Sequence, residues 1–81
     1  MARISAKCDK DRNLVRVGNA VRNRRMALAW SQEALADYAG IDRSHMGKIE
    51  RGERNVTLLN LLRIAKAIEC KLSDLLIDVD L

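Results

Sequence analysis

Apolar residues recur along the chain next to residues that commonly begin helices. In four places an apolar residue comes directly before a Ser, Asp or Thr, and another apolar residue follows four positions after it. The oxygen of the polar side chain can cap the first turn of a helix, and the two apolar residues can pack across that turn. The pattern predicts four helix starts: Trp30-Ser31 with Leu35, Ile41-Asp42 with Met46, Val56-Thr57 with Leu61, and Leu72-Ser73 with Ile77.

A fifth, earlier helix and the ends of two later ones can also be predicted. Gly40 and Gly52 follow the second and third expected helices, where glycine suits the left-handed conformation that ends a helix. Near the N-terminus, apolar residues return at helical spacing. These residues are Leu14, Val17, Val21 and Leu28, within a helix expected over Asn13–Leu28.

The inward faces of these helices predict one hydrophobic core. We expect every member of this core to have a packing role rather than a functional one. The predicted core consists of Leu14, Val17, Val21, Leu35, Ala39, Ile41, Met46, Ile49, Leu58, Leu61, Leu62, Ala65, Ile68, Leu72, Leu75 and Leu76.

Length and composition indicate one small all-α domain. The chain has 81 residues, no proline and four glycines, and a core of this size is marginal without a second copy of the chain.

No apolar run approaches the roughly 18–20 residues that span a bilayer, and no secretion signal is evident, so we expect a cytoplasmic protein. Cys8 and Cys70 are too few and too far apart for a zinc site or a disulfide framework. We expect a basic arm over residues 1–12, a folded domain over 13–77 and a short tail over 78–81.

Charge is distributed unevenly along the chain. Residues 1–25 hold eight Arg or Lys against two Asp, whereas residues 69–81 hold one Lys against four acidic residues. The basic segment is expected to face a polyanion, and the acidic segment is expected to face something else. A solvated basic face would give the same pattern, so charge alone leaves nucleic acid and solvent equally open.

The second and third expected helices are separated only by Gly40-Ile41-Asp42. Two short helices joined by a three- or four-residue turn containing glycine form the helix-turn-helix arrangement. Its packing requires a small residue between the helices, a glycine in the turn and an apolar ridge on the second helix. Ala36, Gly40, Met46 and Ile49 fill these positions.

The stretches SQEALADYAGIDRSHMGKIERGERN and LLRIAKAIECKLSDLL resemble the Cro and phage-repressor-like (XRE) helix-turn-helix family. The resemblance implies a five-helix, lambda-repressor-like domain that lays its third helix, Asp42–Arg51, in the major groove of double-stranded DNA. Several members of this family act as small homodimers. The chain departs from the family pattern at Ala29, where a glycine commonly ends the first helix, at Val56, which replaces a frequent proline, and at Leu59, in a usually polar position.

The polar side of the third helix is expected to read the DNA sequence. By position in the motif, Arg43, Ser44 and Lys48 correspond to the family's base-reading residues, and an arginine can bind guanine O6 and N7 together. Gly47 lies on the same side, where a missing side chain either lets the helix approach DNA or serves packing or bending. His45 suits contact with a base, contact with a phosphate or plain solvent about equally.

Other polar residues are expected to hold the DNA backbone or the fold. The family's glutamine at the start of the second helix, here Gln32, binds a phosphate, which agrees with the free N–H groups at a helix start. The resemblance places Arg25 and Glu50 in a partly buried ion pair that joins the first helix to the third. Further expected phosphate contacts are Arg51, Arg54, Asn55 and Arg22, while Arg3, Lys7 and Lys10 are either solvated charges or long-range attractors.

The C-terminal stretch SDLLIDVDL alternates apolar residues with acids. It is too acidic to bind DNA but apolar enough to bury against another chain, so we expect it to form a homodimer interface. The alternative is a frayed tail on a monomer. The expected interface residues are Leu75, Leu76, Ile77, Val79 and Leu81, with Leu59 as a further candidate.

Together these features predict a sequence-specific transcriptional regulator that binds a palindromic operator as a homodimer. Phage-type repressors and controller proteins of restriction–modification systems both fit. A protein-interaction module, such as an antitoxin, is the alternative from another class. A single histidine, no metal-ligand cluster and no phosphate-cradling loop argue against an enzyme, a cofactor or a small-molecule ligand. Two aromatic residues are too few for an RNA-stacking platform.

Overall fold

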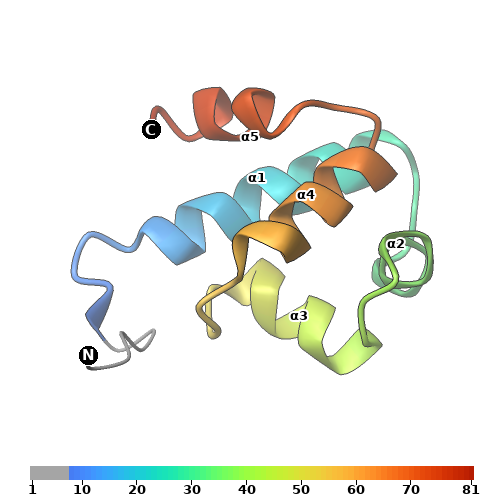
Figure 1. Ribbon diagram of the computed structural model, residues 1–81, viewed down its shortest axis with the longest axis horizontal. Coiled ribbons are helices and arrows are strands. Elements are labelled where there is room, and N and C mark those ends of the chain that lie inside the picture. Colours follow the sequence, from blue (N-terminus) through green and yellow to red (C-terminus); the bar gives the residue numbers. More distant parts are fainter. Residues whose placement is uncertain (1–7) are drawn as a thin grey trace.

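The computed structural model describes residues 8–81, which form five helices and no strand (Figure 1). This confirms the expected all-α, five-helix fold. Helix α1 packs against α3 on one side and α5 on the other, and α4 packs against α2 and α5. No helix in this part of the chain is both long enough and apolar enough to cross a membrane. In chain order the helices are α1 (Asn13–Ala27), α2 (Gln32–Ala39), α3 (Arg43–Arg51), α4 (Leu58–Ala67) and α5 (Leu72–Asp78).

Three of the four predicted helix starts are confirmed. At α2, α3 and α4 the polar residue lies at the cap position, and its side-chain oxygen accepts a backbone hydrogen bond from the first turn. Each bond satisfies an N–H that the helix itself cannot. The donors Ala34, His45 and Asn60 reach the caps Ser31, Asp42 and Thr57 at 3.0, 3.2 and 3.1 Å.

The fourth start, predicted at Ser73, is wrong. Helix α5 begins earlier, at Leu72, with Lys71 in the cap position. The backbone N–H of Lys71 donates to Asp74 Oδ2 at 2.9 Å, so an acid inside the helix reaches back to close its first turn. Ser73 therefore lies within the helix rather than before it.

Helix α1 begins and ends by means other than a Ser or Thr cap. The carboxylate of Asp9 accepts hydrogen bonds from the N–H groups of Asn13 at 2.9 Å and Leu14 at 2.8 Å. The helix ends at Ala27, one residue before the predicted end, and Ala29 follows with φ 58°. The left-handed conformation costs an alanine roughly 1 kcal/mol, and this is the conformation expected of the glycine that the family commonly carries there.

The core is continuous across all five helices, and Val21, Leu35, Met46, Ile64 and Leu75 are fully buried in it. Two predicted core members, Leu58 and Leu62, are instead exposed, because they lie beside the stripe of α4 that faces inward. Ile64 in that stripe was missed. Four predicted members are only half-buried: Leu14, Leu61, Leu72 and Leu76.

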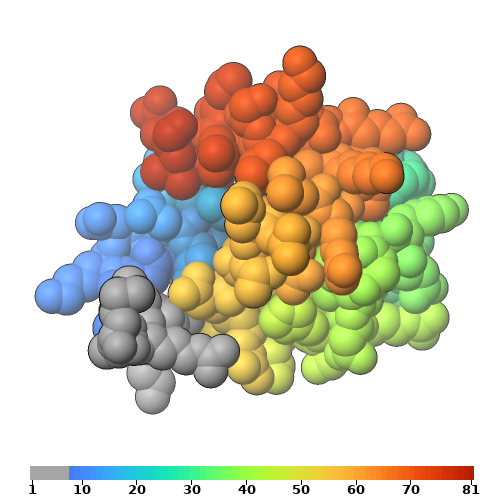
Figure 2. Space-filling model, in the orientation of Figure 1, coloured from blue at the N-terminus to red at the C-terminus, as the bar shows by residue number. Residues whose placement is uncertain are grey.

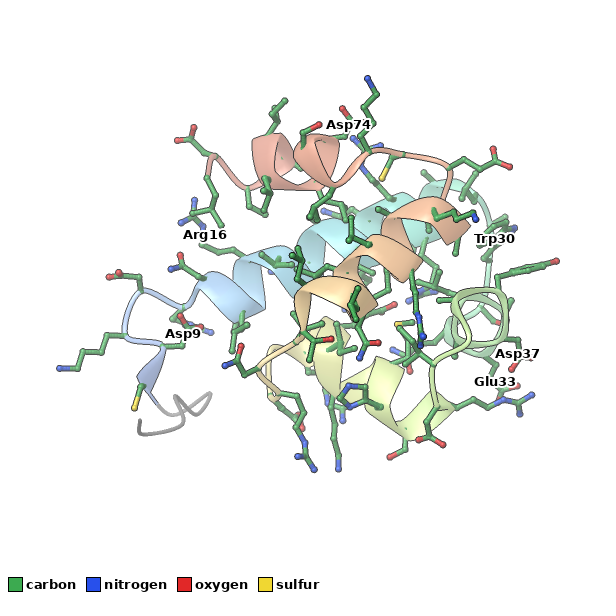
Figure 3. All side chains as sticks on the ribbon, in the orientation of Figure 1. Asp9, Arg16, Trp30, Glu33, Asp37 and Asp74 are labelled. Carbon is green, nitrogen blue, oxygen red and sulfur yellow. The ribbon has the colours of Figure 1, made fainter. Side chains whose placement is uncertain are left out.

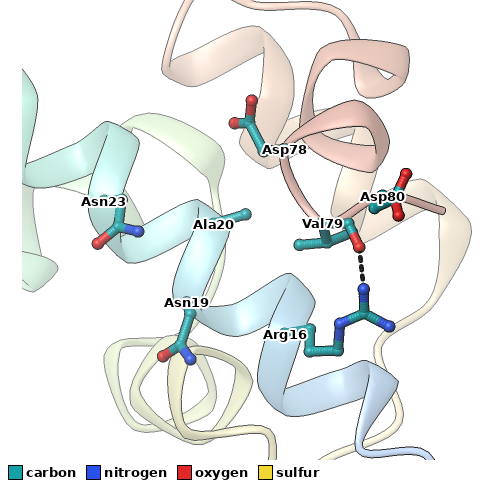
Figure 4. A pocket seen from close by; sticks show the side chains of 7 residues that line it. All are labelled: Arg16, Asn19, Ala20, Asn23, Asp78, Val79 and Asp80. Atoms are coloured by element: carbon teal, nitrogen blue, oxygen red, sulfur yellow. Dashed lines mark hydrogen bonds between the residues drawn. The ribbon is translucent and has the colours of Figure 1, made fainter.

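The C-terminal tail is held against α1 by two arginines. Arg16 donates to the carbonyl oxygen of Val79 (Figure 4). Arg24 Nε lies 2.6 Å from Asp78 Oδ2 and forms an ion pair with that carboxylate. The hydrogen bond from Arg24 lowers the pKa of the Asp78 carboxyl. Residues 78–79 are therefore docked on the domain rather than frayed.

This docking corrects part of the expected dimer interface. Leu75 is 1% exposed and Val79 is 8% exposed, so both belong to the core of the single chain and offer no surface to a second copy. Ile77 and Leu81 remain exposed, and Leu76 is half-buried.

Candidate nucleic-acid interface

Helices α2 and α3 form the expected helix-turn-helix. Gly40 ends α2 with φ 69°, and the N–H of Ile41 then donates to the carbonyl of Ala36 at 2.9 Å. Ala36, Met46 and Ile49 are all buried where the two helices meet, as their spacing predicted. Since the apolar side of α3 is committed to this contact, its polar side is left outward.

The outward side of α3 carries the predicted base-reading residues. Arg43 and Ser44 are exposed, and Lys48 and His45 are half-buried. Helix α3 lies on the side of α1 opposite α5, along the lower edge of the molecule in Figure 2, where neither α4 nor α5 covers it. A short cationic helix is thus accessible to a large partner.

The sequence placed Gly47 on the exposed, polar side of α3, but the structure shows that Gly47 is covered. It is buried, and a β-carbon there would lie 3.0 Å from Arg51 Nη1 and 3.1 Å from Gln32 Oε1. The glycine therefore makes room for two side chains expected to contact phosphate, which agrees with the packing alternative. Gln32, the first residue of α2, can therefore lie against α3 at Gly47.

The expected ion pair between Arg25 and Glu50 is present and joins α1 to α3. Arg25 Nε donates to Glu50 Oε2 at 2.8 Å and Nη2 donates to Oε1 at 3.0 Å, with side-chain exposures of 12% and 2%. Arg25 Nη1 also donates to the carbonyl of Trp30 at 2.8 Å. Gln32 Nε2 donates to Glu50 Oε1 at 3.2 Å, so the buried carboxylate orients the expected phosphate-binding amide as well as pairing the arginine.

Two of the expected DNA-contacting arginines are already paired with exposed acids. Arg43 Nη2 lies 3.3 Å from Asp37 Oδ2 and Nη1 lies 3.5 Å from Glu33 Oε2. Arg51 Nε lies 2.6 Å from Glu53 Oε2. Hydrogen bonding to Asp37 raises the pKa of Arg43, and hydrogen bonding to Arg51 lowers the pKa of Glu53. These acids were not among the residues predicted for the site, although Glu33 and Asp37 stand four residues apart on one helix face.

The other expected phosphate contacts are exposed but lie outside α3. Arg54 and Asn55 are exposed in the loop after Gly52, which ends α3 with φ 73°, and Arg22 is exposed on α1. Lys10 is also exposed, whereas Arg3 and Lys7 lie outside the described residues. The structure thus brings Gln32 of α2 beside Arg51 of α3 at Gly47 and leaves Arg22 on a separate helix.

Comparison with known proteins identifies the family of this arrangement. The HTH_3 helix-turn-helix family is matched over residues 21–75. Control protein C.MunI of a Mycoplasma species is 36% identical over 67 residues, which cover 82% of this chain and 90% of C.MunI. Control protein C.SmaI of Serratia marcescens is 48% identical over 46 residues, covering 57% of this chain and 55% of C.SmaI, so the chain spans just over half of that relative.

A solved structure supports the same grouping. The restriction-modification controller protein C.AhdI from Aeromonas hydrophila superposes with a TM-score of 0.76 at 44% identity. The match covers 78% of this chain and 96% of C.AhdI. The likeness therefore includes the helix-turn-helix and most of the surrounding domain.

Proposed function

Since the chain belongs to the HTH_3 helix-turn-helix family, we propose that it is a sequence-specific DNA-binding transcriptional regulator that binds a palindromic operator as a homodimer. The observation that carries this proposal is the two-sided character of α3. Met46 and Ile49 anchor the helix in the core, while Arg43, Ser44 and Lys48 face outward. A major groove about 12 Å wide admits one such helix.

The residues divide into those that read bases and those that hold the backbone. Arg43 at the start of α3 reaches base edges, where its two terminal nitrogens match guanine O6 and N7. Ser44 and Lys48 contact neighbouring bases, with His45 at the edge of the groove. Phosphates are held by Gln32 at the start of α2 and by Arg51, Arg54, Asn55 and Arg22.

The dimer forms through an apolar surface made by α4, α5 and the C-terminal residue of the tail. We define this surface by Leu59, Leu76, Ile77 and Leu81, of which Leu59 is 69% exposed and Ile77 is 72% exposed. Figure 2 shows the N-terminal part of α4 beside α5 and the tail on one face. Two-fold pairing through this surface would present two copies of α3 to half-sites about 34 Å apart.

Replacing Ile77 by lysine is expected to dissociate the dimer while the monomer stays folded. Burying an isoleucine contributes about 1.5–3 kcal/mol, and a two-fold interface loses two of them, so the dimer dissociation constant rises about 100-fold or more. Sedimentation equilibrium would show a shift toward the 9.1 kDa monomer. The control is Met26→Lys, the same change at an apolar residue of α1 that is 56% exposed and lies outside the surface. Equal behaviour of the two variants would count against this interface.

Replacing Arg43 by glutamine tests the reading role. Loss of a two-pronged guanine contact is expected to weaken operator binding by about 1–3 kcal/mol per half-site, with a much smaller effect on random DNA. Fluorescence anisotropy with an operator duplex and a random duplex measures both. Arg54→Gln serves as the comparison, because loss of a phosphate contact weakens binding to both duplexes alike. If Arg43→Gln behaved in that uniform way, it would not be a base reader.

Within this class, the controller of a restriction–modification system is the subtype that the relatives favour. C.MunI, C.SmaI and the solved C.AhdI all carry that description. Genes for a restriction endonuclease and its matching methyltransferase beside the coding gene would support this subtype, and a phage repressor neighbourhood would replace it.

A further inference from the structure

Glu33 and Asp37 form a carboxylate pair that faces the first residue of the reading helix. They lie one turn apart on α2, and Figure 3 shows them side by side next to the turn that leads into α3. Both are well exposed, with side-chain exposures of 69% and 62%. Neither packs in the core; Glu33, in the first turn of α2, also interacts favourably with that helix's dipole, whereas Asp37 lies in its last turn.

The contact occupies the atoms of Arg43 that reading requires. Arg43 Nη2 donates to Asp37 Oδ2 at 3.3 Å and Nη1 lies 3.5 Å from Glu33 Oε2, so both terminal nitrogens are within ion-pair distance of the α2 carboxylates. A two-pronged contact with guanine O6 and N7 uses N–H groups of this same guanidinium. Arg43 must therefore turn away from the carboxylates before it can enter the groove, and the lost ion pairs oppose binding.

We propose that Glu33 and Asp37 act through Arg43 to weaken operator binding, and so set the protein concentration at which the operator becomes occupied. The inference rests on the proposed reading role of Arg43. The pair stabilises the free protein, and that stabilisation is lost in every complex in which Arg43 leaves α2. The carboxylate pair consequently lowers the affinity for the operator without raising the protein's preference for the operator over other DNA sites.

The expected size of the effect is modest because the ion pairs are exposed to solvent. Exposed pairs of this kind correspond to roughly a twofold to fivefold change in an equilibrium constant. A dimer breaks the contact in both half-sites, so the combined effect is about fourfold to 25-fold. An effect of that size is large enough to shift a switch that responds to its own concentration.

The test measures operator affinity of the full chain carrying Glu33→Gln and Asp37→Asn together, in two backgrounds. With Arg43 present, the double change is expected to tighten binding at 0.15 M salt by about fourfold or more. In the Arg43→Gln background the gain should be at least threefold smaller, because the residue on which the carboxylates act is gone. Circular dichroism verifies that each variant is folded.

A charge control separates this contact from general attraction to DNA. Asp11→Asn with Glu69→Gln removes the same charge from exposed residues that form no ion pair within residues 8–81. A gain of equal size in this control, or in the Arg43→Gln background, would overturn the proposal. So would weaker operator binding by the Glu33 and Asp37 variant, which would mean that the carboxylates orient Arg43 in the complex. Arg43→Gln alone reports separately on the reading role.

Discussion

Replacing Arg25 by methionine is expected to lower the free energy of unfolding by about 3–5 kcal/mol. The change removes both hydrogen bonds that Arg25 makes to Glu50 and leaves a carboxylate with 2% side-chain exposure without its counter-charge. Only the Gln32 amide, at 3.2 Å, would remain beside it. Urea unfolding at pH 7 measures the loss, and in a domain of this size it corresponds to a melting temperature lower by roughly 12 °C or more.

The double variant Arg25→Met with Glu50→Met is the control for this prediction. It removes both charges, and apolar replacement of a buried pair is often neutral or stabilising. The double variant should therefore be far more stable than Arg25→Met alone, while it still loses the orientation of Gln32. If the single and double variants unfolded at the same urea concentration, an uncompensated charge would not be the cause of the loss.

Replacing Gly18 by alanine is expected to lower the free energy of unfolding by about 1–2 kcal/mol. A β-carbon at this position would lie 2.5 Å from the carbonyl oxygens of both Ile49 and Glu50. These are backbone atoms of α3 that cannot rotate aside, so α1 and α3 must separate, and overpacking of this kind costs about 1–3 kcal/mol or more. Alanine is the better helix former by about 1 kcal/mol, which offsets only part of the loss.

Gly47→Ala is the matched control, since it carries the same gain in helix propensity. There the new β-carbon meets only the ends of the Arg51 and Gln32 side chains, which can move. Stability should rise by up to about 1 kcal/mol, while DNA binding weakens because both side chains are displaced. Guanidinium chloride unfolding of the two variants in parallel isolates the packing contribution. Similar stabilities would show that α1 and α3 do not need their close approach at Gly18.

The parts of the fold that depend on local chemistry could be predicted from the sequence. Ser31, Asp42 and Thr57 cap their helices because a cap needs only the residues of one turn. Helix α5 escaped the same reasoning, because Asp74 closes its first turn from inside. The apolar positions of α4 surround much of the helix, so the pattern could not tell that Leu58 and Leu62 stay outside the core.

The contacts that bring distant segments together could not be predicted in this way. The tail was expected to bury Val79 against a second chain, but Arg16 and Arg24 of α1 dock it onto its own domain. At the site, the ion pair of Arg25 with Glu50 was expected only through family resemblance. The pairing of Arg43 with α2 depends on the angle between two helices, which no local pattern reports.

Selection of bound sites from random duplex DNA, with the unaltered chain and with Arg43→Gln, tests most directly whether α3 reads bases in the major groove. The unaltered chain should yield a palindromic consensus with half-sites about one helical turn apart and a guanine–cytosine pair in each half. Arg43→Gln should lose the preference at that pair and keep the rest. Sites without a consensus, or an identical consensus from both proteins, would contradict base reading by Arg43 at the start of this helix.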